Sequence, residues 1–227
     1  MGMEWYDAIA RRNGGYRSDA VYAIEGVSGE VVFEKELADM LSNADTVLDA
    51  GCGHGEFTLR MSKNARHIIG FDFSVEMIKI ANQLLAASKV ENVQFVQATT
   101  KLPLPFKDEQ FDLIYDRRGP TSILEHSRIL RSGGTVFGIH SGSLDLVTRR
   151  LHENGFIDME IREFNDAVCI YPSQEEFIRA MSDTPGHPDY NDPKHREELD
   201  RLIAQHMSVE GKIVKQDYRF IWKAMKP

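Results

Sequence analysis

The chain has 227 residues, 42% of them hydrophobic, and a formal charge of −8 because 35 acidic side chains outnumber 27 basic ones. This length and composition predict one sizeable core, so we expect residues 1–227 to form a single domain. The acidic balance opposes the phosphate backbone of nucleic acids and favours a small-molecule partner over RNA or DNA.

The sequence shows no run approaching the ~20 apolar residues of a membrane span. The stretch Met1–Trp5 also lacks the basic and apolar parts of a secretory signal. We therefore expect a cytoplasmic protein without a membrane anchor. Cys52 and Cys169 are the only cysteines, and the histidines show no compact ligand spacing, so we predict neither a disulfide framework nor a metal site.

Residues 1–28 combine charge, glycine and aromatic side chains, which is typical of an N-terminal arm rather than a domain. Two interpretations of the arm remain open. It folds over a ligand pocket and brings Tyr6 or Tyr16 near substrate, or its rings cover exposed core. Residues 30–42 carry apolar side chains at helical spacing and open a predicted cofactor-binding core over residues 30–170.

Residues 47–57 pass from an apolar run through Asp49 into three glycines, which predicts a strand, a tight turn and a helix start. Glycine adopts positive φ and has no Cβ, so such a turn lets a ligand approach the main chain and the N-terminus of the helix. The spacing Gly51-x-Gly53-x-Gly55 differs from the G-x-G-x-x-G of dinucleotide-binding turns. We expect the backbone amide of His54, within this turn, to matter more than its ring.

A second acid, Asp72, ends the next apolar run about 20 residues after the glycine turn, the separation expected within one βαβ unit. A carboxylate at this place can accept hydrogen bonds from both hydroxyl groups of a ribose. Ser74 follows as a candidate N-cap for a helix over about residues 74–88.

Residues 47–57 and Asp72 resemble the first two motifs of class I S-adenosylmethionine-dependent methyltransferases. The resemblance implies S-adenosylmethionine as cofactor, with its methionine part over the glycine turn and its ribose on Asp72. It also implies an α/β fold with a doubly wound, mostly parallel seven-stranded sheet whose last strand is antiparallel. The positions that we assign to the cofactor are Asp49, Gly51, Cys52, Gly53, Asp72, Phe73, Thr99, Thr100 and Asp116.

Thr99 and Thr100 follow a predicted strand over residues 93–97, at the place where this family usually has an acid that accepts a hydrogen bond from the adenine amino group. The acid is missing here, so we expect Thr99 or a backbone carbonyl to serve. The Leu-Pro-Leu-Pro-Phe stretch at 102–106 and the Phe-Asp pair that opens the strand at 111–116 also match the family's pattern.

Residues 128–136 resemble the family's turn between a helix and the fifth strand. We expect Gly133-Gly134 to end a helix over about 121–131 before a strand over 134–140. The other expected elements are strands at about 46–50 and 67–72 and a helix at about 55–63. Their alternation predicts a parallel sheet with helices on both faces.

The end of the fourth strand is where this family usually faces the acceptor, and here it reads Asp116-Arg117-Arg118. Two alternatives remain open: the arginines hold a carboxylate or phosphate of the substrate, or one pairs with Asp116 and ties down the loop. His140, at the end of the fifth strand, is our candidate general base. The alternative is a hydrogen-bonded structural histidine.

Beyond the fifth strand, Ser143 is expected to cap a helix that ends at Gly155, before a sixth strand over 156–164. A helical insert over residues 171–212 then precedes the last strand, residues 213–227. The insert is expected to lie at the mouth of the active site as a lid. The substrate candidates that it contributes are Tyr171, His187 and Tyr190.

The leading interpretation is transfer of a methyl group from S-adenosylmethionine to an oxygen, nitrogen or carbon atom of a small-molecule acceptor. An RNA or protein acceptor is the second, which the acidic charge and the lack of an Asn-Pro-Pro-Tyr-like motif make less favourable. A cofactor-binding protein without catalysis is the third, favoured by the missing adenine acid. The acceptor and the oligomeric state remain open.

Overall fold

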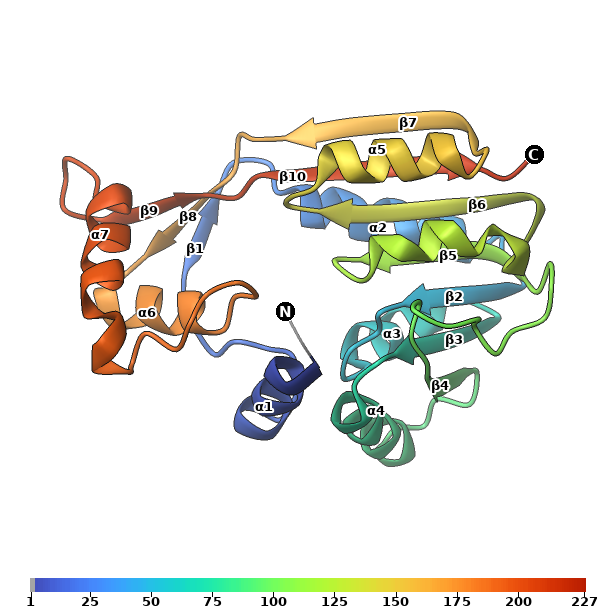
Figure 1. Ribbon diagram of the computed structural model, residues 1–227, viewed down its shortest axis with the longest axis horizontal. Coiled ribbons are helices and arrows are strands. Elements are labelled where there is room, and N and C mark those ends of the chain that lie inside the picture. Colours follow the sequence, from blue (N-terminus) through green and yellow to red (C-terminus); the bar gives the residue numbers. More distant parts are fainter. Residues whose placement is uncertain (1–2) are drawn as a thin grey trace.

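A computed structural model describes residues 3–227 (Figure 1). Met1 and Gly2, the first residues of the expected arm, lie outside the described residues. The α-helices are α1 Met3–Asn13, α2 Gly29–Leu41, α3 Glu56–Met61, α4 Val75–Ala87, α5 Leu144–Glu153, α6 Gln174–Ser182 and α7 Arg196–His206. Short 3-10 helices span η1 Ser62–Asn64, η2 Thr121–Ile129 and η3 Pro193–His195. The strands are β1 Ala23–Glu25, β2 Thr46–Ala50, β3 His67–Asp72, β4 Val93–Gln97, β5 Phe111–Arg117, β6 Leu130–His140, β7 Ile157–Phe164, β8 Val168–Tyr171, β9 Ile213–Gln216 and β10 Arg219–Met225.

Seven of the strands form one sheet in the order β4-β3-β2-β5-β6-β10-β7. Neighbouring strands from β4 to β6 are parallel, whereas β10 runs antiparallel to both β6 and β7. This arrangement confirms the expected doubly wound, mostly parallel sheet. It also confirms that the last strand lies between the fifth and sixth strands of this sheet.

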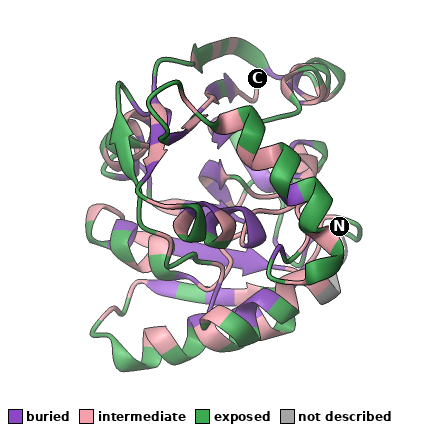
Figure 2. Ribbon diagram, turned by 90° about the vertical axis from the view of Figure 1, so that its left-hand side faces the viewer, coloured by how far each residue is buried: buried purple, intermediate pink, exposed green. Residues whose placement is uncertain are grey.

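Helices cover both faces of this main sheet, and the packing explains why each forms. On one face, α2 begins at Ser28, whose hydroxyl accepts the Glu30 N–H (3.3 Å), and buries Phe33 and Leu37 beside α3 and α4. On the other face, α5 and η2 bury Val147 and their other apolar side chains in a second cluster. The central strands β2, β3, β5 and β10 are accordingly mostly buried, whereas the edge strand β7 is largely exposed (Figure 2).

Trp222 of β10 shows how closely the main sheet is packed. It is fully buried and lies opposite Gly138 of β6, where a Cβ would stand 2.2 Å from the indole ring. A glycine is therefore required at position 138 of β6. The ring of His140 packs nearly parallel to the indole of Trp222, with the ring centroids 6.3 Å apart.

A separate antiparallel sheet, β1-β8-β9, packs with α6 and α7 around Phe177 and Tyr190. We call this group of elements the small lobe; it lies to one side of the main sheet, and α1 lies between the two regions (Figure 1). The expected last strand over 213–227 is therefore two strands, because β9 pairs in the small lobe before the chain enters the main sheet as β10. The N-terminal arm likewise contributes a helix and a strand.

The expected helix over 121–131 is wrong in type and extent. Residues Thr121–Ile129 form 3-10 turns with a kink at His126, and β6 already begins at Leu130. The glycine pair lies inside β6, in a bulge where the register with β5 shifts, and Gly133 has φ 72°. The pair thus serves a strand irregularity and does not end a helix.

The side-chain cap expected from Ser143 at the start of α5 is not formed. Ser143 stands at the N-cap of α5 but has φ 67°, and its side chain makes no capping hydrogen bond. Ser173, in contrast, caps α6 by accepting the Glu176 N–H (3.3 Å). None of the helices in the described part of the chain combines the length and apolar character that a bilayer crossing needs.

Candidate active site

The glycine turn between β2 and α3 is closely packed. The N–H groups of Gly51 and Cys52 both donate to the carbonyl oxygen of Phe71 (2.9 Å each), which holds the turn against the end of β3. Gly51 has φ 83°, and a Cβ there would stand 2.8 Å from the Cα of Gly119. The turn therefore needs glycine for its backbone conformation and for the close approach of the loop after β5.

Asp72 ends β3 beside this turn and is almost completely buried. One carboxylate oxygen accepts the Gly53 N–H (3.1 Å), and the other accepts the Ser74 N–H (2.9 Å). Burial raises the pKa of Asp72, and these hydrogen bonds oppose the rise. Since each carboxylate oxygen has two lone pairs, Asp72 keeps acceptor capacity for a ligand.

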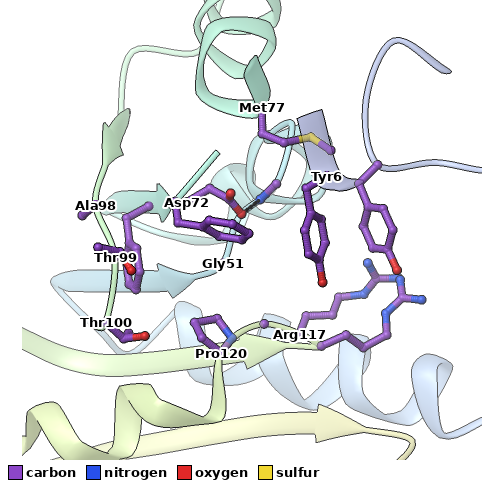
Figure 3. A pocket seen from close by; sticks show the side chains of 15 residues that line it. Tyr6, Gly51, Asp72, Met77, Ala98, Thr99, Thr100, Arg117 and Pro120 are labelled. Atoms are coloured by element: carbon purple, nitrogen blue, oxygen red, sulfur yellow. Dashed lines mark hydrogen bonds between the residues drawn. The ribbon is translucent and has the colours of Figure 1, made fainter. Parts of the chain in front are cut away.

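Asp72 and the glycine turn line a pocket at the carboxyl ends of the parallel strands, the edge where open α/β sheets bind ligands. In Figure 3, Thr99 and Thr100 lie at one end of this pocket, and Tyr6 and Arg117 lie at the other. The lining residues are Tyr6, Tyr16, Gly51, Gly53, Phe71, Asp72, Phe73, Met77, Ala98, Thr99, Thr100, Arg117, Arg118, Gly119 and Pro120.

The threonine end lacks a carboxylate, as its sequence requires. Thr100 bonds through its hydroxyl to Ser122 (2.7 Å), and its carbonyl oxygen faces His126 Nε2 (3.0 Å). The hydroxyl oxygen of Thr99 accepts the Lys101 N–H (3.3 Å). The hydroxyl of Thr99 thus keeps its own proton and a lone pair for a ligand at this end.

The N-terminal arm folds over the end of the pocket opposite the threonines, and Tyr16 lines the pocket there. Of the two interpretations of the arm, the structure therefore favours the one in which it covers the ligand pocket. The Tyr16 N–H donates to Nδ1 of His54 in the glycine turn (3.2 Å). The ring of His54 therefore anchors the arm, a role that the expectation of a backbone contact missed. Tyr6 meets Phe73 edge-on (centroids 5.2 Å apart) and closes the same side of the pocket.

The two arginines at the end of β5, Arg117 and Arg118, line this end of the pocket, and both approach Glu30 of α2. Nε of Arg117 donates to a Glu30 oxygen at 3.0 Å, and Nε of Arg118 lies 3.3 Å from the other oxygen. Neither arginine pairs with Asp116, so that alternative is wrong.

Burial raises the pKa of Tyr16 to about 12, although Arg118 opposes the rise. The phenol of Tyr16 therefore keeps its proton at neutral pH.

Asp116 and His140 form a buried pair instead. His140 Nε2 lies 3.1 Å from one oxygen of Asp116, and the other oxygen accepts the Gly119 N–H (2.6 Å). Neither residue lines the pocket. The geometry favours the structural interpretation of His140 over the general base, because the ring packs on Trp222 and holds the carboxylate that fixes the loop.

Two further positions assigned to the cofactor also lie behind the pocket wall. Asp49 is buried and accepts hydrogen bonds from the hydroxyl groups of Thr58 (2.6 Å) and Tyr115 (2.7 Å). Burial raises its pKa to about 6, while the same hydrogen bonds oppose the rise. Cys52 turns its side chain toward Gly70 of β3, and burial raises the pKa of its thiol. Both side chains support the turn from beneath.

The three substrate candidates from the insert do not reach the pocket. Tyr171 and Tyr190 are buried in the core of the small lobe. His187 Nδ1 lies 3.0 Å from the Tyr190 hydroxyl, which donates to Glu198 (2.8 Å). The expectation failed because these rings supply the apolar area that the small lobe needs for a core of its own.

Sequence reasoning missed Met77, Gly119 and Pro120 among the lining residues. A Gly-Pro pair directly after a strand marks a tight turn, so the sequence carried a usable signal for the loop at the sheet edge. Met77 gave no such signal, because its spacing in α4 is that of a core residue. Within residues 3–227, no group of three or more His, Cys, Asp or Glu side chains is arranged to hold a metal ion.

Comparison with known proteins places this site in a family. The sequence model of the methyltransferase domain matches residues 41–216. The uncharacterized methyltransferase YcgJ of Bacillus subtilis is 32% identical over 131 residues, which cover 52% of this chain and 48% of that protein. The demethylmenaquinone methyltransferase of Lactiplantibacillus plantarum is 37% identical over 78 residues, covering 33% of this chain and 32% of that protein. The chain thus spans about half or less of these relatives.

A solved structure of a functionally unknown protein from Deinococcus radiodurans shares the fold along nearly the whole chain. The TM-score is 0.72 at 24% identity, with 99% of this chain and 100% of that chain covered. The matched methyltransferase domain contains the glycine turn, Asp72 and the six main-sheet strands from β2 to β7. The chain belongs to the methyltransferase domain family, with the fold of the class I S-adenosylmethionine-dependent methyltransferases.

Proposed function

We propose that this protein binds S-adenosylmethionine in the pocket beside the glycine turn and transfers its methyl group to a small-molecule acceptor. The observation that carries the proposal is the placement of Asp72. Its carboxylate lines the middle of the pocket, with both oxygens already oriented by the N–H groups of Gly53 and Ser74.

The residues present fit this cofactor. Gly51 and Gly53 leave the turn without Cβ atoms, so main-chain atoms line the pocket where the methionine part would lie. Asp72 is a hydrogen-bond acceptor for ribose hydroxyl groups. Thr99 or a neighbouring backbone carbonyl would receive the adenine amino group, although the usual acid is missing.

S-adenosylmethionine, when bound, supplies an electrophilic methyl group: the acceptor's lone pair forms the new bond to carbon, and the electrons of the broken carbon–sulfur bond stay on sulfur. The chain's own task is to orient the acceptor and exclude water. Tyr6 and Tyr16 close the pocket on the side of the arm. Since His140 does not line the pocket, we propose no proton transfer through it.

A small-molecule acceptor is supported by the demethylmenaquinone methyltransferase among the relatives and by the acidic charge of this chain. The identity of the acceptor cannot be carried over from such relatives. Tyr6 and Tyr16 belong to the arm, and the arm precedes the residues 41–216 that match the family. This end of the pocket therefore lies partly outside the residues that the family model matches.

Calorimetric titration of the protein with S-adenosylmethionine, S-adenosylhomocysteine and NAD tests the proposal. We expect dissociation constants in the micromolar range for the two sulfur compounds and no heat from NAD, because the glycine spacing does not suit a dinucleotide. Transfer of a labelled methyl group into a panel of small molecules, RNA and protein then separates the acceptor classes.

The outcomes of these two measurements are distinct. No binding of either sulfur compound would contradict the cofactor assignment. Binding without methyl transfer to any acceptor class would favour the cofactor-binding protein without catalysis, the alternative that the missing adenine acid supports.

A further inference from the structure

Three arginines converge on a single carboxylate at the end of the pocket formed by the arm. The Nε atoms of Arg117, Arg118 and Arg219 lie 3.0, 3.3 and 3.5 Å from the oxygens of Glu30. Arg219 also pairs with Asp217 at 2.7 Å. The cluster therefore contains three guanidinium groups and two carboxylates, an excess of one positive charge.

Three groups beside the arginines have defined surroundings. Burial alone would raise the pKa of Glu30, but Arg118, Arg117 and Arg219 together hold it below its usual value, so Glu30 is already counted as an anion. Tyr16 is a neutral phenol at physiological pH, since its pKa is about 12. Asp116, on the same loop, is engaged by His140 and the Gly119 N–H.

Arg117 and Arg219 are held more closely than Arg118, although the terminal amino groups of Arg117 also have no polar partner among residues 3–227. The guanidinium of Arg117 lies over the ring of Phe57, 4.5 Å from its centroid, in addition to its hydrogen bond with Glu30. Arg219 donates to the Tyr218 carbonyl oxygen (2.8 Å) as well as pairing with Asp217, and only 18% of its side chain is exposed.

Arg118 has the most exposed side chain of the three arginines. Its side chain is 37% exposed and lines the pocket. Among residues 3–227 its only polar partner is the Glu30 oxygen near its Nε, and that oxygen has no hydrogen bond from any described residue. The two terminal amino groups of Arg118 therefore keep a planar pair of donors for an anion, the geometry that matches carboxylate and phosphate.

The backbone at Arg118 is strained in a way that fixes this side chain. Its φ of 61° lies in the left-handed region, which a residue with a long side chain rarely adopts. The conformation is held by the hydrogen bond from its N–H to the Ile139 carbonyl oxygen (3.0 Å) and by Gly119 packing on the Ala50 carbonyl. Strain of this kind concentrates at ligand sites.

The position of Arg118 points to the acceptor and away from the adenine end. Arg118 lines the pocket directly after Arg117, beside Tyr16 of the arm and Glu30 of α2. The threonines lie at the other end (Figure 3). A bound sulfonium would add a further positive charge here and favour an anionic acceptor.

We propose that Arg118 binds an anionic group, a carboxylate or phosphate, on the methyl acceptor. This inference rests on the proposed function, and it defines the substrate class as small anionic molecules. Arg117 and Arg219 act on Arg118 by sharing Glu30, which leaves the cluster one anion short until the acceptor arrives.

The test titrates inorganic phosphate and benzoate into protein saturated with S-adenosylhomocysteine, at constant ionic strength, and follows the arginine Nε–H signals by NMR. We expect at least one of the two anions to bind. Arg118→Asn, which accommodates the left-handed backbone, should weaken binding about tenfold or more, because a charge-assisted pair is lost. Arg118→Lys keeps the positive charge but lacks the planar pair of donors, so it should restore only part of the affinity. Arg149→Gln, on the surface of α5, is the control and should change nothing.

A second titration separates the acceptor from the carboxylate of the cofactor itself. S-adenosylhomocysteine and 5′-methylthioadenosine, which lacks the amino-acid part, are compared on the protein and on Arg118→Asn. The inference is supported if the unaltered protein and Arg118→Asn bind S-adenosylhomocysteine with equal affinity, and if phosphate or benzoate binds to the unaltered protein saturated with S-adenosylhomocysteine. Selective loss of S-adenosylhomocysteine affinity, or anion binding indifferent to Arg118, would overturn it. Failure of S-adenosylhomocysteine to bind the unaltered protein would instead contradict the proposed function.

Discussion

The main sheet and the small lobe are built from the chain in opposite ways. In the main sheet, the glycine turn and Asp72 belong to consecutive elements, β2, α3 and β3. In the small lobe, β1, β8 and β9 come from the arm, from the middle of the chain and from a segment near its C-terminus. A motif made of neighbouring elements can be recognised from the sequence, whereas a lobe assembled from distant segments cannot.

Aromatic residues illustrate this difference. Tyr16 in the arm lines the pocket, whereas Tyr171 and Tyr190 are buried in the small lobe. Both kinds of residue look alike in sequence, as isolated tyrosines in segments without a motif. Helix α1 contacts both regions: Asp7 pairs with Ser74 at the start of α4, and Arg12 pairs with Asp183 at the end of α6.

The largest expected effect tests whether the small lobe has a core of its own. Phe177 is fully buried and meets Tyr171 edge-on (centroids 5.2 Å apart). Phe177→Ala should lower the free energy of unfolding of the lobe by about 3–5 kcal/mol. Hydrogen exchange should then rise in β8 and α6 while β2 and β3 stay protected. Val209→Ala, at a fully exposed site in the same lobe, is the control. Equal loss of protection in both regions would show that they unfold as one unit.

Overpacking of the main sheet should lower the free energy of unfolding nearly as much as Phe177→Ala does. A Cβ on Gly138 would meet the indole of Trp222 at 2.2 Å, in a site where both strands are held by neighbours. Gly138→Ala should therefore destabilise the protein by about 3 kcal/mol in urea unfolding. Gly142→Ala, where the added Cβ finds open space, should stay within about 0.5 kcal/mol. Similar midpoints for the two variants would contradict the tight fit of β6 on β10.

Removal of the carboxylate in the pocket should affect binding more than folding. Asp72→Ala should weaken S-adenosylhomocysteine about 100-fold, because hydrogen bonds to a charged acceptor are lost together with the orientation of the glycine turn. Calorimetry measures the change, and Asp108→Ala, at an exposed site, is the control. An unchanged affinity would remove the observation that carries the proposed function.

A smaller effect is expected on the pH dependence of stability, through the carboxyl of Asp49 beneath the glycine turn. Because burial raises the pKa of Asp49 to about 6, its folded form holds a proton more tightly than the unfolded form. Its stabilising contribution is full below pH 4 and is lost as pH rises through about 6, a change on the order of 2 kcal/mol. Asp49→Asn should lack this decline.

Urea unfolding between pH 4 and 7.5 measures the difference for Asp49. Asp145→Asn, at an exposed position of α5, should keep the decline of the unaltered protein. If the free energy of unfolding had the same pH dependence in Asp49→Asn and in the unaltered protein, ionisation of Asp49 would not destabilise the folded state.

Local signals in the sequence predicted most of the main sheet. Apolar runs ending in Asp49 and Asp72, with Ser74 as a cap, identify strands and helix starts because the contacts involved are close along the chain. The glycine pair at 133–134 misled the prediction, since a helix stop and a strand bulge use the same left-handed residue. Only the pairing of β6 with β5 decides between them.

The sequence by itself thus determined the glycine turn and the acid beside it, because both lie within one βαβ unit. The tertiary structure decided which side chains face the pocket. It turned Asp116 and His140 toward each other and away from a ligand, and it left Arg118 with free donors. Those outcomes depend on Glu30 and Trp222, which are remote in sequence and meet the loop after β5 and the end of β6 only once the sheet has formed.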